Sequence, residues 1–386
     1  MTELLKLFEP LRAFGTGDNW KMIIMWLIGG ILIYLAIKKQ MEPTLLLPIG
    51  FGAILMNFPG VLEETSKGVY EFHYVGETLE TLYNAGIANE LFPLLLFVGI
   101  GAMIDFGPLL SNPKLMIFGA AAQFGIFFTL CMASVFFPNI NDAASIAIIG
   151  AADGPTSIVV ANALKSNYVG AITVAAYSYM ALVPIIQPPV IKLLTTKKER
   201  RIRMAYTPAK VSQTTKILFP IIITIIACIF APSAGALIGF LMFGNLIREC
   251  GVLESLSETA QKVLANLITI LLGITIAFNM SATQFLRSET LLILGLGLVA
   301  FIVDTAGGVL FAKLFNVILK IFKKDPINPM IGAAGISAFP MSGRIVHKMG
   351  LAEDNQNFLL MHSIGVNVSG QIASVIAGAL ILSIFG

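Results

Sequence analysis

One acidic residue in a long apolar stretch is the first feature that could carry chemistry. Between Leu91 and Ile191 the chain has five charged residues: Asp105, Lys114, Asp142, Asp153 and Lys165. Asp153 stands in the run IGAADGPTS, and a carboxylate within a bilayer costs a few kcal/mol to insert. We therefore expect Asp153 to bind sodium and to exchange it for a proton. The alternative is a structural cap of a broken helix, because Asp before Gly-Pro is also favourable turn chemistry.

A second segment rich in Gly, Pro and Ser, residues 328–346, supplies further polar groups. Asn328 and Ser337 offer neutral oxygens that suit a monovalent cation. Arg344 lies where this segment returns towards the cytoplasm, and a guanidinium there can bind a carboxylate through two hydrogen bonds. The alternative for Arg344 is an anchor at the positively charged face of the membrane.

Tyrosines and two more acids occur in other apolar runs. Tyr177 and Tyr179 stand near the middle of one run, where a buried phenol needs a partner and can relay a proton. A residue of the aromatic belt at the membrane interface is the alternative for both. Asp105 precedes Phe-Gly-Pro and is expected to cap a helix, whereas Asp304 lies within a predicted span and is a secondary candidate.

The composition predicts that these residues are carried by membrane helices. The 386 residues are 56% hydrophobic and 12% charged, with a mean hydropathy of +0.85, which no water-soluble fold requires. Residues Leu4–Phe14 could form a short amphipathic helix on the membrane surface. Apolar runs predict ten spans: Met22–Ile37, Pro43–Phe58, Leu91–Leu109, Leu115–Phe137, Val169–Ile191, Ile217–Phe230, Gly235–Leu246, Leu264–Met280, Leu291–Leu319 and Phe358–Phe385.

Charge sets the expected orientation. The loop between Lys192 and Lys216 is strongly basic and is therefore expected in the cytoplasm. Counting crossings from that loop makes residues 143–164 enter and leave from outside, and residues 328–346 enter and leave from inside. Both segments are thus predicted to be re-entrant broken hairpins.

Internal similarity indicates a repeat. IGAADGPTS from Ile149 matches IGAAGISAF from Ile331, LLFVGIGAMIDF matches TILLGITIAFNM with Gly99 opposite Gly273, and two Ile-Gly-Phe runs match upstream. The matches predict an inverted-topology repeat, with halves 41–195 and 232–386 joined by the basic loop and linker helix 196–231. Residues 1–40 precede the first half. The predicted fold class is an all-α polytopic membrane protein with about ten transmembrane helices and two re-entrant hairpins.

Other site classes find little support in the sequence. There is no basic arm for nucleic acid, no phosphate-binding loop and no dinucleotide fingerprint. The three cysteines are far apart and are expected to be buried packing residues, without a disulfide framework. The three histidines do not form a metal-binding pattern. The cysteines are Cys131, Cys228 and Cys250, and the histidines are His73, His347 and His362.

Four blocks carry a family resemblance: IGAADGPTSIVVANAL, AAYSYMALVPIIQPP, NPMIGAAGISAFPMSGR and NFLLMHSIGVNVSGQIAS. The sequence resembles the beta subunit of the sodium-pumping biotin-dependent decarboxylases of oxaloacetate, methylmalonyl-CoA, glutaconyl-CoA and malonate. The likeness covers nearly the whole chain from about Met22. It implies a multi-pass protein of the inner (plasma) membrane that decarboxylates carboxybiotin, consumes a proton and drives sodium outward.

The resemblance also implies partners and site residues. The partners would be a biotin carrier protein or domain, a carboxyltransferase subunit and a small gamma-type membrane subunit, in a homo-oligomeric assembly. The family's key residues fall on Asp153, Tyr179, Asn328, Gly332, Ser337 and Arg344. Asp153, Tyr179 and Arg344 would be catalytic. Sodium ligands would be Asp153, Asn328, Gly332 and Ser337, and Arg344 with Asn328 would receive carboxybiotin.

Two rival functions remain open at this point. A plain sodium-coupled secondary transporter would use the same repeat and hairpins without decarboxylation. A structural membrane anchor for a soluble enzyme would use neither, and the intramembrane Asp153 argues against it. The decarboxylated acid is not readable, because the carboxyltransferase would select it.

Overall fold

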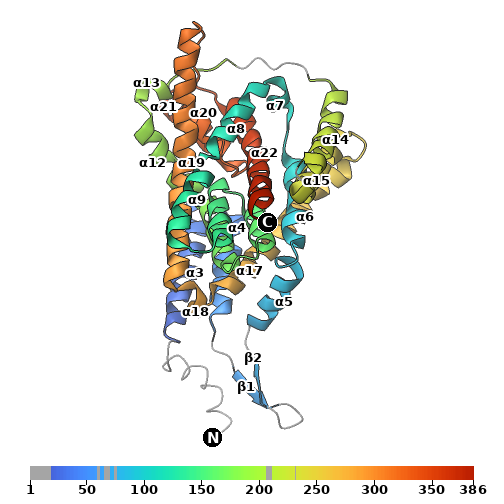
Figure 1. Ribbon diagram of the computed structural model, residues 1–386, viewed down its shortest axis with the longest axis vertical. Helices are drawn as coiled ribbons and strands as arrows, with labels where there is room; N and C mark the ends of the chain where they lie inside the picture. The colour runs from blue at the N-terminus through green and yellow to red at the C-terminus, as the bar shows by residue number, and fades with distance from the viewer. Residues whose placement is uncertain (1–18, 59–60, 65–69, 74–75, 206–210, 231) are drawn as a thin grey trace. The chain divides into compact units, whose positions relative to one another are not determined.

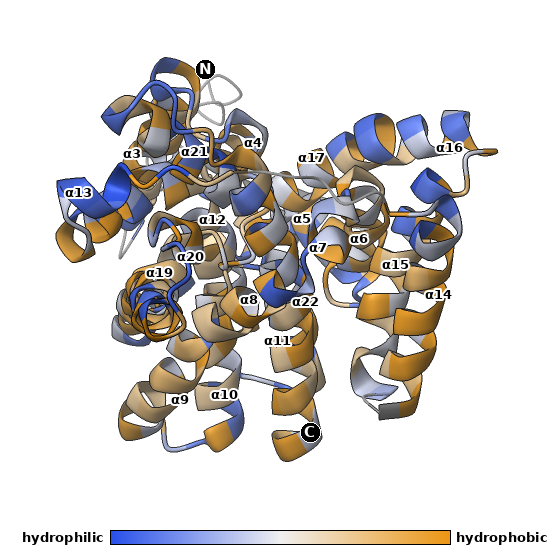
Figure 2. Ribbon diagram, turned by 90° about the horizontal axis from the view of Figure 1, so that it is seen from above, coloured by the Kyte–Doolittle hydropathy of each residue, from blue (hydrophilic) through white to orange (hydrophobic). Residues whose placement is uncertain are grey.

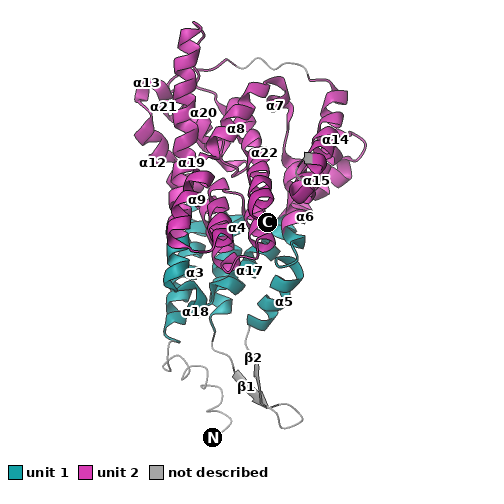
Figure 3. Ribbon diagram, viewed as in Figure 1, with its two compact units in different colours: residues 1–92, 266–293 teal, residues 93–265, 294–386 magenta. Residues whose placement is uncertain are grey.

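The apolar runs fold into helices, which satisfy every backbone polar group within one segment, as a bilayer requires. The computed structural model describes residues 19–58, 61–64, 70–73, 76–205, 211–230 and 232–386. It divides into two compact units (Figure 3): residues 1–92 with 266–293 form unit 1, and residues 93–265 with 294–386 form unit 2. The expected surface helix Leu4–Phe14 lies outside the described residues.

The described residues of unit 1 are mainly helical and include one short antiparallel hairpin, in which Val61 pairs with His73. Gly52 allows close packing of two of its helices, because a methyl group there would overlap Ala277 and the main chain of Ile274. Its elements are α3 (Lys21–Lys39), α4 (Pro43–Met56), β1 (Val61–Glu64), β2 (Tyr70–His73), α5 (Gly76–Gly86), η5 (Ala277–Met280) and α18 (Ala282–Phe285). Three helices run across the unit boundary: α6 (Leu91–Met103), α17 (Ala265–Ile276) and α19 (Ser288–Ile321).

Unit 2 holds both segments that were predicted to be broken hairpins. Its first elements are α7 (Gly107–Ser111), η1 (Pro113–Leu115), α8 (Met116–Ala122), α9 (Phe124–Phe136), α10 (Ile140–Ala147), η2 (Ile148–Ala151), α11 (Gly154–Ala163), α12 (Val169–Leu194) and α13 (Lys197–Arg200). The remaining ones are α14 (Gln213–Phe230), η3 (Pro232–Ala234), α15 (Gly235–Glu249), α16 (Glu254–Glu258), the π-helical η4 (Thr259–Leu264), α20 (Met330–Ala333), α21 (Met341–Glu353) and α22 (Leu360–Phe385), labelled where space allows in Figure 1.

Within the described ranges, six helices are long and apolar enough to cross a membrane: Lys21–Lys39, Pro113–Phe136, Val169–Leu194, Glu254–Met280, Ser288–Ile321 and Leu360–Phe385. Apolar side chains also face outward, as on α14, where Ile222, Ile225 and Ile229 are exposed. Figure 2 shows the hydrophobic colouring of α14 and α15 against the hydrophilic α13. The chain is thus a multi-pass membrane protein by length, composition and surface.

Two predicted spans are not regular helices throughout. The run Leu91–Leu109 is not one helix, since α6 ends at Met103 and α7 begins at Gly107. Asp105 lies one residue before the N-cap Phe106, and its Oδ1 accepts the N–H of Gly107, the first residue of α7, at 2.8 Å. The run Leu115–Phe137 falls in the single candidate span Pro113–Phe136, whose helix is irregular at one residue, Gln123, between α8 and α9.

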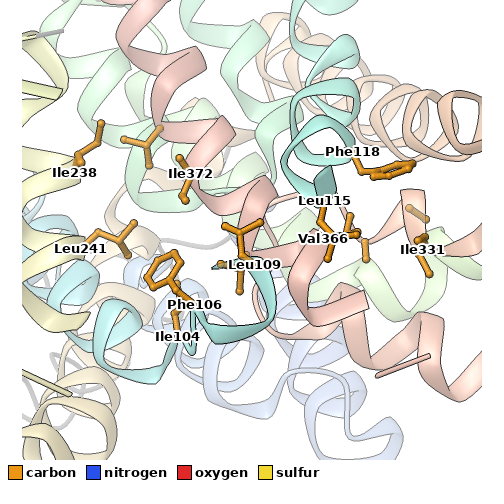
Figure 4. Packing of buried hydrophobic residues seen from close by; sticks show 14 of the residues in the cluster. Ile104, Phe106, Leu109, Leu115, Phe118, Ile238, Leu241, Ile331, Val366 and Ile372 are labelled. Atoms are coloured by element: carbon orange, nitrogen blue, oxygen red, sulfur yellow. The ribbon is translucent and has the colours of Figure 1, made fainter. Parts of the chain in front are cut away.

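The centre of unit 2 is formed by α22, which packs along α8 (Figure 1). Gly119 of α8, Gly335 after α20 and Gly370 of α22 bring three main chains together, because a methyl group on any of them would overlap backbone atoms of a neighbour. Around them lies an apolar cluster that includes Phe118 and Val366 (Figure 4). This packing fixes α22 beside the second broken segment.

The expectation that the cysteines are buried is wrong. Cys131 and Cys228 are exposed, and Cys250 is half-buried. Burial of a thiol is the norm in a water-soluble protein. A membrane helix can also turn an apolar side chain towards lipid tails, so an apolar run does not by itself imply a protein interior.

Candidate functional site

Asp153 begins α11 at the break of the first hairpin. Its backbone is extended, with φ −130° and ψ 96°, and Pro155 occupies the first turn of the helix. The preceding residue, Ala152, has a positive φ of 53°, which turns the chain out of η2. The Asp153 Oδ1 accepts the Thr156 N–H at 3.4 Å, so the carboxylate does cap this helix. The Asp153 side chain is also buried, with only 3% of its surface exposed, so it caps the helix from within the protein interior.

The second carboxylate oxygen of Asp153 gathers hydroxyl and amide donors from three elements. Its Oδ2 accepts hydrogen bonds from Thr156 Oγ1 at 2.7 Å, Ser374 Oγ at 3.0 Å, Gln371 Nε2 at 3.1 Å and Ser337 Oγ at 3.4 Å. Thr156 belongs to α11, Ser374 and Gln371 belong to α22, and Ser337 belongs to the second broken segment. Oδ2 is crowded, whereas Oδ1 has one long hydrogen bond among the described residues.

All of these donors are neutral. A buried carboxylate without a cationic partner is unstable unless it takes up a proton or a cation. The hydroxyl groups suit either state, because each can donate to the carboxylate or turn its oxygen towards a bound cation. The arrangement can therefore bind a small monovalent cation in competition with a proton.

The two broken segments contact each other at this carboxylate. The Ser337 N–H donates to the carbonyl of Ala151 at 3.1 Å, one main chain to the other. Ser337 Oγ also lies 2.9 Å from Ser374 Oγ. The structure thus brings together Asp153 and Ser337, as the sequence predicted.

The two tyrosines of α12 have different surroundings. The Tyr179 hydroxyl donates to the carbonyl of Leu294 in α19, and within the described residues it forms no hydrogen bond with Asp153. Tyr177 is fully buried and its hydroxyl has no hydrogen-bond partner among the described residues. Its ring lies against Gly154, where a methyl group would overlap it. Tyr177 is therefore the tyrosine that packs beside the residue following Asp153.

Asn328 is engaged away from Asp153 in this conformation. Its Nδ2 donates to the carbonyls of Arg200 and Ile202, both at 2.9 Å, and its Oδ1 accepts the Met330 N–H at 3.1 Å. It ties the start of the second broken segment to the basic loop. Its role as a sodium ligand stays a prediction.

Gly332 is a packing site in α20. A methyl group on Gly332 would overlap the main chain of Gly308 in α19, and the reverse also holds. The two helices therefore meet backbone to backbone at these glycines. A direct role of Gly332 at sodium stays a prediction.

Arg344 lies on α21, where its side chain is exposed and forms no ion pair within the described part of the chain. The end of α21 is tied to the basic loop, since Glu353 pairs with Arg200 at 2.7 Å and Asp354 pairs with Arg203 at 2.7 Å. The hydrogen bond from Arg200 holds the pKa of Glu353 below its ordinary value. Arg344 thus has no ion pair to break before it binds an anion, unlike Arg200 and Arg203.

Three residues at the carboxylate were missed by the sequence reasoning: Thr156, Gln371 and Ser374. A signal for the latter two exists in α22, where polar residues recur at Ser363, Asn367, Gln371 and Ser374. This spacing places a polar stripe on one face of an apolar helix. All four are buried. This polar stripe in the sequence predicts which face of α22 is directed towards Asp153.

Helices that can cross a bilayer, together with a buried carboxylate where two broken segments meet, define a multi-pass membrane protein with a polar site in its interior. Comparison with known proteins gives the family. Residues 21–385 match the family model described as the Na⁺-transporting oxaloacetate decarboxylase beta subunit, and the chain belongs to this family.

Several relatives are similar over nearly their whole length. The methylmalonyl-CoA decarboxylase subunit beta of Propionigenium modestum is 48% identical, with 96% of each chain covered. The glutaconyl-CoA decarboxylase subunit beta of Acidaminococcus fermentans is 48% identical, covering 95% of this chain and 94% of the relative. The oxaloacetate decarboxylase beta chain of Klebsiella pneumoniae is 43% identical, with 99% of each covered. The family expected from the four sequence blocks is confirmed.

Proposed function

We propose that this chain is the membrane subunit of a biotin-dependent decarboxylase sodium pump. It decarboxylates carboxybiotin, consumes a proton in doing so, and couples the reaction to outward sodium transport. The observation that carries the proposal is the buried Asp153, which receives only neutral donors where the two broken segments meet. The family membership supports the choice of sodium and of a decarboxylation.

Asp153 would exchange sodium for a proton. Sodium binds the ionised carboxylate, whereas a proton neutralises it, so each occupant weakens the other by the same factor. Ser337, Ser374 and Thr156 supply hydroxyl oxygens around the carboxylate. Moving one charge against about 100 mV costs about 2.3 kcal/mol, so the release of sodium has to be tied to the consumption of a proton.

The remaining site residues would act around this exchange. Tyr179, and Tyr177 beside Gly154, would pass the proton, because each has a buried phenol on α12. Asn328 and Gly332 would join the sodium path in a conformation that opens the second segment. These assignments rest on the family resemblance together with their placement on α12 and the second segment.

Arg344 would hold the carboxylate of carboxybiotin, aided by Asn328. Its exposure and lack of an ion pair within the described residues favour this role, because a paired guanidinium would have to break a contact first. The cofactor would arrive on a biotin carrier protein or domain loaded by a carboxyltransferase subunit. A small gamma-type membrane subunit, a homo-oligomeric assembly and the inner (plasma) membrane complete the proposal.

The proposal includes the inverted repeat and ten spans. In unit 1, Gly52 of α4 packs against Ile274 of α17, and in unit 2, Gly101 of α6 packs against Leu241 of α15. In the sequence matches, Gly52 aligns with Leu241, and Gly101 aligns with Thr275, the residue after Ile274. Each contact thus joins a helix of the first half to a helix of the second, and the pair α4 with α17 corresponds to the pair α15 with α6, which supports the repeat.

The test is Asp153→Asn in proteoliposomes that contain the subunit with its partners. Asparagine keeps an oxygen to cap α11 but cannot ionise. We expect sodium-dependent decarboxylation of carboxybiotin to be abolished while the protein still inserts. Asp142→Asn is the matched control, because Asp142 is also buried but lies in the first turn of α10, where Ser166 and Asn167 donate hydrogen bonds to it. Normal turnover of Asp153→Asn, or sodium transport without any decarboxylation by the wild type, would contradict the proposal.

A further inference from the structure

A second buried carboxylate, Asp304, lies in unit 2. It belongs to α19 and is 0% exposed. Its Oδ1 accepts the N–H of Gly125, at the start of α9, at 2.5 Å. This bond explains why the predicted span Leu115–Phe137 is irregular at Gln123, since an acid from another helix satisfies a free N–H at the first turn of α9. Asp304 therefore has one oxygen with a structural role.

The other oxygen of Asp304 has no such role. Its Oδ2 has no hydrogen bond of normal geometry among the described residues, and the N–H of Ile126 is a further main-chain donor that acts on the carboxylate. It faces Gly150 of η2, where a methyl group would lie 2.7 Å from it. A capping side chain needs to supply only one acceptor oxygen, and asparagine would supply it without a formal charge. Capping of α9 therefore does not explain why residue 304 carries a second, negatively charged oxygen.

Among the described residues, no ion pair compensates Asp304. The elements packed against it, α8, α9 and η2, carry no charged residue, and the titratable side chain of α9, Cys131, is exposed. On α19 the nearest cation is Lys313, more than two turns away, which pairs with Glu199 at 3.1 Å. An ionised Asp304 would be an unpaired charge in an apolar interior, a state that costs several kcal/mol.

We propose that Asp304 is a second proton-binding carboxyl group of the membrane interior, and that its proton controls the first broken segment. Binding forms an O–H bond at Oδ2, and release leaves the electron pair on Oδ2 and passes the proton to water. Gly150 is three residues before Asp153, so the charge of Oδ2 acts on the same short stretch that presents Asp153. Loss of the proton disfavours the packing of Asp304 Oδ2 against Gly150, because the ionised oxygen then needs water or a cation.

The proton site is tested by chemical labelling, which needs no turnover. Dicyclohexylcarbodiimide adds to a protonated carboxyl group in an apolar environment and yields an N-acylurea without a leaving group. Peptide mass spectrometry of the labelled protein should find the adduct at Asp304 and its yield should fall with rising pH, about tenfold per unit above the group's pKa. Asp142 serves as an internal control, since its two oxygens are occupied by Ser166 and Asn167. Absence of label at Asp304 over the whole pH range overturns the proposal.

The control of the first segment is tested with Asp304→Asn, which keeps the acceptor for Gly125 but removes the ionisable group. We expect the sodium-dependent turnover to fall about a hundredfold, the contribution typical of a positioned proton donor, and its pH profile to flatten. A purely structural cap predicts an unchanged profile, and that result overturns the proposal. This arm rests on the proposed pump, whereas the label does not. If Asp153→Asn kept normal turnover, the proposed pump function would be refuted. Labelling of Asp304 would still support the proton site.

Discussion

Thr156→Val is the sharpest probe of the Asp153 site. Thr156 Oγ1 is the nearest donor to Asp153 Oδ2, at 2.7 Å, and the substitution removes this hydroxyl while keeping the branched shape and the N–H that bonds Oδ1. A hydrogen bond to a charged acceptor contributes about 1.5–3 kcal/mol, against about 1 kcal/mol for a neutral pair. Its loss therefore disfavours the ionised carboxylate, relative to the protonated one, by about 1 kcal/mol.

This difference sets the expected result. Sodium needs the ionised carboxylate, and about 1 kcal/mol is about fivefold in an equilibrium constant. The sodium concentration for half-maximal decarboxylation should thus rise about fivefold in Thr156→Val, measured with carboxybiotin and the reconstituted subunit. Thr173→Val is the matched control, because Thr173 is equally buried but its hydroxyl donates to the carbonyl of Val169. Equal sodium requirements in the two variants would refute the reasoning.

Three further outcomes are expected. Gly308→Ala should destabilise the protein by about 1–3 kcal/mol through overlap with α20, whereas Gly295→Ala, with open space on the same helix, should not; thermal unfolding in detergent checks both. Arg344→Ala should raise the carboxybiotin requirement more than the sodium requirement, and the reverse ranking in paired titrations would count against its role. The lowered pKa of Glu353 means that its bond with Arg200 stabilises the fold above the ordinary glutamate pKa of about 4.3 and is lost as pH falls through the lower value. Arg200→Ala should therefore flatten the loss of thermal stability at acidic pH.

The meeting of Asp153 and Ser337 could be predicted from sequence because both stand in Gly- and Pro-interrupted segments. Such segments are stable at membrane depth only where protein covers them or where they line a water-filled cavity. Their partners on α22 were missed for a different reason. Gln371 and Ser374 lie in an uninterrupted apolar helix, and a polar stripe shows which face is buried without showing what it faces.

Helix boundaries were less predictable, because contacts from distant residues set them. The irregularity at Gln123 depends on an acid on α19, Asp304, which hydropathy cannot associate with it. Asn328 shows the same limit: its type suits a cation, but its amide binds the main chain of the basic loop. The six long helices agree with the predicted spans in place, while the ten-span topology and the repeat halves remain predictions.

The neutrality of the donors around Asp153 Oδ2 has an electrical consequence. In the described part of the chain, the site presents one formal negative charge, and a single sodium ion or a single proton would each cancel it. Replacement of one by the other is then electroneutral, and no counter-charge has to move with it. The transmembrane voltage would act on ions as they enter and leave, so the barriers that prevent leakage belong to the approaches on either side and not to the carboxylate itself.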